Sequence, residues 1–116
     1  MYALFIVLNE VDYLDTILDK FMEVGVKGAT ILDSRGRGGE MADRNLPLFG
    51  SLKTLFDGAR PFNKTIFSVI PNEELLNRTV AAVKEVAGSI EKPSAGFMFT
   101  MPVANVYSLG SEHNQE

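Results

Sequence analysis

The chain has 116 residues, of which 46% are hydrophobic, and it carries a formal net charge of −4. This length and composition fit one folded domain with a packed core and exclude a disordered chain. The acidic balance argues against a nucleic-acid-binding surface, and the absence of cysteine excludes disulfides, thiolate metal sites and a cysteine nucleophile.

The first part of the chain predicts a strand, a helix and a second strand. Residues 2–8 form a dense apolar run typical of a buried strand. We expect Asp12 to cap a helix that ends at Gly25, followed by a strand over 29–34. The apolar positions of this helix recur at helical spacing and are Leu14, Ile17, Leu18, Phe21 and Met22. The N-terminal run has no basic flank and is too short for a signal segment or a membrane span, so we expect a cytoplasmic protein without membrane insertion.

The second part repeats the same order after a long connection. Residues 35–63 hold glycines, prolines and an apolar middle, and a connection of this length in a small domain is more often functional than decorative. A strand is expected over 64–70, then a helix capped by Asn72 that ends near Gly88, then a strand over 96–101. The apolar face of the second helix is Leu75, Leu76, Thr79, Val80 and Val83.

Two strand–helix–strand units predict an α+β ferredoxin-like sandwich, with two helices on one face of a four-stranded antiparallel sheet. We expect one domain over residues 1–110 and a polar tail over 111–116. The strands carry apolar residues on both faces, whereas two helices cover only one. The uncovered face needs a partner, most simply further copies of the same chain, and the alternative is that the C-terminal tail folds over it.

Two segments carry a family resemblance. Residues 23–38, which include the runs EVGVKGAT and SRGRG, resemble the part of PII signalling proteins that leads into their T-loop. Residues 92–103, which begin KPSAGFMF, resemble the B-loop and last strand of that family. The chain is therefore similar to a divergent PII-like protein in which residues 35–63 form the T-loop-like segment.

The resemblance implies a non-enzymatic regulatory protein that forms a homotrimer and binds ATP, ADP or AMP in clefts between subunits. It also implies control of a target protein, such as a membrane transporter or a metabolic enzyme, and leaves the role of magnesium open. Backbone amides of glycine-rich turns can hold phosphate without a charged side chain. The implied nucleotide contacts are Leu8, Gly28, Ala29, Thr30, Gly36, Gly38, Val69, Ser94, Ala95 and Gly96. The implied target contacts are Leu48, Phe49 and Phe56, unless this apolar segment packs back on the protein.

The chain departs from the family where phosphate is normally clamped. Phe97 replaces the basic residue after the B-loop glycine, and Ser108 and Gly110 stand where the family has two arginines. Charge-assisted hydrogen bonds are stronger than neutral ones, so we expect ADP or AMP to compete well with ATP. The cations that could substitute are Arg35, Arg37, Lys92 and Arg60. The family's T-loop glutamine and its modified tyrosine also have no counterpart, so 2-oxoglutarate sensing and nucleotidylation do not carry over.

Other functions use the same order of elements. Amino-acid-binding regulatory modules and small hydrolases share it, because a fold does not determine a function. The long connection disfavours the amino-acid-binding module. The sequence shows no nucleophile–base pair and no metal-ligand spacing, so no catalytic or metal-binding residue is assigned.

Overall fold

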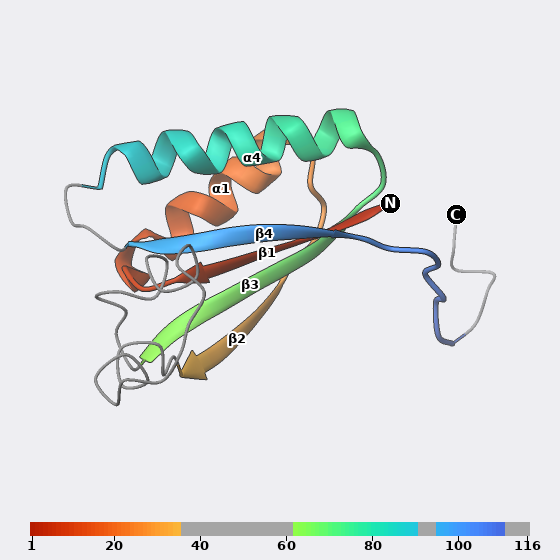
Figure 1. The fold of residues 1–116 in the computed structure, drawn as a ribbon, viewed down its shortest axis with the longest axis horizontal. Coiled ribbons are helices and arrows are strands. Elements are labelled where there is room, and N and C mark those ends of the chain that lie inside the picture. The colour runs from red at the N-terminus through yellow and green to blue at the C-terminus, as the bar shows by residue number, and fades with distance from the viewer. Residues whose placement is uncertain (36–61, 91–94, 111–116) are drawn as a thin grey trace, which may run out of the picture.

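The computed structural model describes residues 1–35, 62–90 and 95–110, and it contains one antiparallel sheet covered by helices on one face (Figure 1). The elements in chain order are β1 (Tyr2–Leu8), the short 3-10 helix η1 (Val11–Tyr13), α1 (Leu14–Val24), β2 (Thr30–Arg35), β3 (Phe62–Ile70), α4 (Glu73–Gly88) and β4 (Gly96–Pro102). The strands lie in the order β2-β3-β1-β4, and every neighbouring pair is antiparallel. The predicted ferredoxin-like α+β fold is confirmed.

The core lies between the helices and the sheet. Alternate residues of a strand point to opposite faces, so Leu4 and Ile6 of β1 face the helices together with Ile66 of β3. Helix α1 adds Ile17 and Phe21 to this layer. Helix α4 adds a longer stripe of buried residues, which are Leu75, Leu76, Thr79, Val83 and Val86.

The two helices begin in different ways. The Asn72 side-chain oxygen accepts a hydrogen bond from the Leu75 amide at 2.8 Å, so the predicted cap of α4 is confirmed. The predicted cap of the first helix by Asp12 is wrong. Asp12 lies inside η1, and Tyr13 takes the cap position without a side-chain hydrogen bond. The reason is that the Tyr13 amide bonds to the Glu10 carbonyl at 3.1 Å, which starts a tighter turn before the helix begins.

The end of α1 follows the prediction. Gly25 has a φ of 105°, a left-handed conformation that glycine adopts without strain, and its amide bonds to the Phe21 and Met22 carbonyls at 3.2 Å. Met22 was expected in the core but is 76% exposed. The buried stripe of α1 runs through Ile17 and Phe21, and Met22 lies beside it on the solvent side.

Three strands have boundaries that differ from the prediction, and the smallest difference is that β4 ends at Pro102 instead of Met101. Strand β2 begins at Thr30 and ends at Arg35, one residue later than expected at each end. Strand β3 begins at Phe62, two residues earlier than expected. Both extensions have one cause, because Arg35 pairs with Phe62 and Ser34 pairs with Asn63 in the β2–β3 ladder. Neither described helix is long and apolar enough to cross a bilayer.

Candidate functional site

The implied nucleotide contacts that the structure describes lie at two opposite ends of the sheet. At one end, β1 finishes at Leu8 and β4 starts at Gly96, and the register pairs Leu8 with both Gly96 and Lys64. Arg35, the last residue of β2, lies at this end too. We call it the loop end. At the other end, which we call the turn end, the chain turns through residues 25–30 into β2 beside the last residues of β3.

The turn end brings Gly28 and Val69 together. Both line a pocket of about 260 Å³, together with Lys27 and Pro71. The Ser68 hydroxyl donates to the Gly28 carbonyl at 2.5 Å, which fastens the turn to β3. Gly28 itself is exposed, and a side chain built on it would meet nothing within 4 Å. Gly28 therefore presents open backbone at the surface of the subunit.

Lys27 is a cation that the sequence analysis did not select. It is exposed and lines the same pocket as Gly28. The signal was present in the run EVGVKGAT, where the lysine directly precedes the glycine of the turn. Ala29 and Thr30, the other two implied contacts here, are also exposed, and Thr30 opens β2 opposite Phe67.

The loop end is built tightly around Ala95 and Gly96. The Ala95 carbonyl accepts hydrogen bonds from the Asn9 amide at 2.7 Å and from the Glu10 amide at 3.2 Å. A Cβ atom at Gly96 would lie 2.2 Å from the Val7 carbonyl oxygen, so only glycine fits there. Leu8 is 3% exposed and its side chain belongs to the core, so within one subunit this side chain is not accessible to a ligand at the loop end.

Arg35 is the described candidate cation at the loop end. Its guanidinium lies 4.8 Å from the centre of the Phe62 ring, a cation–π geometry that leaves the residue exposed. The remaining predicted contacts, namely Gly36, Arg37, Gly38, Lys92, Ser94, Leu48, Phe49 and Phe56, lie outside the described residues, as do Arg60 and the 111–116 tail.

Within one subunit, the loop end and the turn end of the sheet lie too far apart for their residues to meet at one point. Leu8 lies opposite Lys64, whereas Val69 lies opposite Ala3. Lys64 and Val69 are five positions apart on β3, which corresponds to about 17 Å along a strand. Leu8 also faces the helices while Val69 faces the opposite side of the sheet. The implied base contacts are therefore separated within a single chain.

The sheet face away from the helices carries a row of aromatic side chains. Phe5 stacks between Phe67 and Phe99, with ring centres 5.4 Å and 4.9 Å away, and Phe97 lies 6.3 Å from Phe99. We call these four residues the aromatic row. Phe99 is 43% exposed, and further exposed apolar residues on the same face are Leu32, Val69 and Met101. This face is apolar and uncovered in one subunit, as the sequence predicts.

The described part of the tail does not cover this face. Residues 103–110 continue past the end of β4 and lead away from the sheet (Figure 1). The Val103 amide donates to the Met1 carbonyl at 2.9 Å, and beyond it Tyr107 is 81% exposed and Leu109 is 94% exposed. The alternative in which the tail folds over the sheet is not found for residues up to Gly110.

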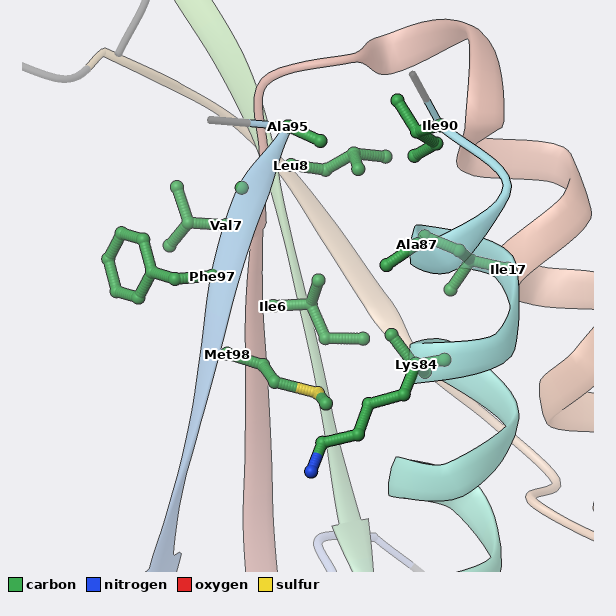
Figure 2. A pocket seen from close by; sticks show the side chains of 12 residues that line it. Ile6, Val7, Leu8, Ile17, Lys84, Ala87, Ile90, Ala95, Phe97 and Met98 are labelled. Atoms are coloured by element: carbon green, nitrogen blue, oxygen red, sulfur yellow. The ribbon is translucent and has the colours of Figure 1, made fainter. Parts of the chain in front are cut away.

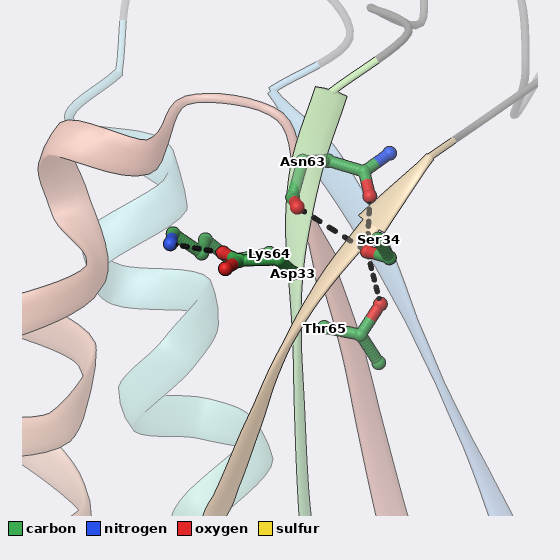
Figure 3. A network of polar contacts seen from close by, with 5 residues as sticks. All are labelled: Asp33, Ser34, Asn63, Lys64 and Thr65. Carbon is green, nitrogen blue, oxygen red and sulfur yellow. Dashed lines mark hydrogen bonds and ion pairs between the residues drawn. The ribbon is translucent and has the colours of Figure 1, made fainter.

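A polar network closes the loop end of the same face (Figure 3). The Ser34 hydroxyl lies 2.8 Å from the Thr65 hydroxyl and bonds to both the carbonyl and the side-chain oxygen of Asn63. The Asn63 amide nitrogen donates to the Asn9 side chain at 3.3 Å. The network connects β2 and β3 to the chain that follows β1. It lies next to the end of β2 and the start of β3, the two strand ends that segment 36–61 joins. The sequence analysis did not predict it.

Within residues 1–35, 62–90 and 95–110, no cluster of three His, Cys, Asp or Glu side chains could hold a metal ion. The ion pair of Lys64 with Asp33 lies on the helix-covered side of the sheet and joins β2 to β3 (Figure 3). The exposed turns, the open backbone and the surface cations fit recognition of a polar ligand.

A ferredoxin-like sandwich with a long segment between β2 and β3 and an apolar sheet face that no described helix covers places the chain in a class of small α+β domains. Comparison with protein families makes the class specific, because the family model of the nitrogen regulatory protein P-II matches residues 1–113. The chain belongs to the P-II family, a family of small regulatory signalling proteins. No curated protein sequence matches it.

Proposed function

We propose that the protein is a cytoplasmic, non-enzymatic regulator that binds an adenine nucleotide in clefts between the subunits of a homotrimer. It controls a target protein, such as a membrane transporter or a metabolic enzyme, through the T-loop-like segment 35–63. The family match supports the regulatory class. The observation that carries the proposed site is the separation of its residues between the loop end and the turn end of the sheet.

This separation favours a site shared by two subunits. If the turn end of one copy faces the loop end of the next, Gly28 and Val69 meet Ala95 and Gly96 across the boundary. Exposed backbone amides at such a boundary suit phosphate oxygens. Lys27 adds a cation beside Gly28, and Arg35 adds one at the loop end.

The uncovered face supports assembly. A contiguous apolar face on one subunit is normally buried against a partner, and the aromatic row lies in the middle of the sheet. P-II family proteins are typically trimeric. A trimer closed around these faces has three equivalent boundaries, and each boundary supplies one nucleotide site.

The nucleotide preference follows from the cations. Phe97 belongs to the aromatic row, so it contributes apolar surface where the family has a basic residue. Ser108 and Gly110 are exposed and carry no charge. With fewer charge-assisted contacts to a third phosphate, ADP and AMP compete well with ATP for the site.

Isothermal titration calorimetry of the purified protein tests the proposal. ATP, ADP and AMP are titrated with and without magnesium, and native mass spectrometry measures the oligomer in the same samples. We expect about one nucleotide per subunit with a Kd in the micromolar range, or roughly −8 kcal/mol of binding free energy. Absence of heat with all three nucleotides refutes the nucleotide site, and a monomer refutes the shared boundary.

A glycine variant tests the location of the site. Gly28→Val adds a side chain at the proposed boundary, and the subunit itself has space for the added Cβ atom. We expect the affinity to fall by about tenfold or more, which is about 1.4 kcal/mol. Gly88→Ala is the matched control, because Gly88 also has open space but lies at the end of α4. A trimeric Gly28→Val protein that binds as tightly as the control would place the nucleotide elsewhere.

A further inference from the structure

A second cavity, open to solvent on one side, lies between β1, β4 and α4 (Figure 2). Its volume is about 140 Å³, and its walls are almost entirely apolar. The floor is formed by core residues, which are Ile6, Leu8, Ile17 and Val83. Lys84, Ala87 and Gly96 are exposed and form its rim. The cavity is distinct from the pocket at the turn end, with which it shares no residue.

The size of the cavity indicates what it can hold. An apolar cavity of about 150 Å³ inside a protein stays dry and binds benzene. The cavity beside α4 has nearly that volume and a comparable aliphatic lining. It therefore accommodates an apolar group of about six carbon atoms, and it offers no polar groups on its floor for water.

The rim carries one positive charge. Lys84 projects from α4 toward Met98 on β4, and its ammonium lies at the side of the cavity (Figure 2). Among the described residues, the ion pairs involve Lys20 with Glu23 and Glu85, and Lys64 with Asp33, so Lys84 has no carboxylate partner there. The nearest acidic residue in sequence, Glu85, is already 3.6 Å from Lys20. As far as the described residues show, the charge at the rim is therefore available to an anion.

We propose that this cavity binds a small amphiphilic monocarboxylate of about six carbons, with its apolar chain inside and its carboxylate at the Lys84 ammonium. The apolar walls select the chain, and the single cation selects one negative head group. Ala95 and Gly96 line the cavity on the side of the loop end, so the bound chain contacts the start of β4. All residues of this site come from one subunit, and binding there does not require a nucleotide.

Nuclear magnetic resonance of the full-length protein without nucleotide tests the proposal. Hexanoate and hexanamide have the same chain length and differ in charge. We expect hexanoate to shift the methyl signals of Ile6, Ile17 and Met98 and to bind about two- to fivefold tighter than hexanamide, the range of an exposed ion pair. Each methylene removed from the acid weakens binding by about fourfold. No shift of these methyl groups at millimolar hexanoate overturns the proposal, as does equal binding of acid and amide.

Two variants separate the charge from the cavity. Lys84→Met keeps the apolar stem and removes the ammonium, so it should bind acid and amide equally. Lys20→Met is its control, because Lys20 contacts Glu23 and Glu85 away from the cavity and its loss should leave the preference for the acid unchanged. Ala87→Phe fills the cavity from the rim and should abolish binding of both compounds. A Lys84→Met protein that still prefers hexanoate, or an Ala87→Phe protein that still binds it, refutes the assignment.

Discussion

Gly96 offers the sharpest test of the packing at the loop end. It begins β4, pairs with Leu8 and has a φ of 155°. In the Gly96→Ala variant, the new Cβ atom would lie 2.2 Å from the Val7 carbonyl oxygen and 3.2 Å from the Leu8 Cα atom. Both neighbours belong to the backbone of the central strand β1, so no side-chain rotation relieves the contact.

The cost has two sources. Forcing a methyl group into a filled site costs about 1–3 kcal/mol, and an unfavourable backbone conformation for alanine costs about 1–3 kcal/mol more. Relaxation of β4 reduces the sum, so we expect a loss of about 3 kcal/mol in the free energy of unfolding. For a domain of this size, such a loss lowers the Tm by about 12 °C.

Thermal unfolding followed by circular dichroism measures this change. The parent and the variant are compared at one subunit concentration, since the stability of an oligomer depends on concentration. Gly88→Ala is the control, because its Cβ atom would meet nothing within 4 Å and alanine has a higher helix propensity than the glycine it replaces in α4. A Gly96→Ala protein with the same Tm as Gly88→Ala would refute the close approach of β4 to β1.

Three further predictions concern capping, core packing and assembly. Asn72→Ala removes the acceptor of the Leu75 amide and should lower the free energy of unfolding in urea by about 1 kcal/mol, whereas Asn72→Ser should keep most of that stability. Equal losses in the two variants would contradict a capping role. Ile66→Ala empties a fully buried site and should cost about 2–5 kcal/mol; a loss below 1 kcal/mol would mean that the core between the layers collapses around the gap. Phe99→Asp places a charge in the aromatic row and should dissociate the oligomer in native mass spectrometry, whereas Met22→Asp on the exposed side of α1 should not. Intact oligomers in both variants would show that the open face of the sheet is not the interface.

The fold could be predicted because its signals are local and repeated. Each signal lies within a short segment: the apolar run indicates strand β1, the helical spacing indicates α1, and the asparagine indicates the start of α4. Two strand–helix–strand units then leave few topologies. The cap of α1 was missed because Asp12 matches a capping pattern, while the tighter bond from Tyr13 to Glu10 decided the geometry.

The site was less predictable because it depends on contacts between distant segments. The early start of β3 at Phe62 arises from its pairing with Arg35, which no short window of sequence shows. The separation of Leu8 from Val69 follows from the strand register. Lys84 looks like any surface lysine of an amphipathic helix, and only the cavity beside it distinguishes it from the others.

The central position of β1 has a consequence for how the chain is made. Its first residue pairs with Ile70 on one side and with Pro102 on the other, so the strand that comes first in this sheet along the chain is completed by the strand that comes last. Contacts between such distant segments slow folding, because the intervening chain must close before they form. An apolar strand whose partner strands have not yet been synthesised is prone to aggregation. A nascent chain stopped before Gly96 would hold β1 with one edge unpaired and Phe5 without Phe99, one of its two stacking partners, so the sheet is complete only after β4 has been synthesised.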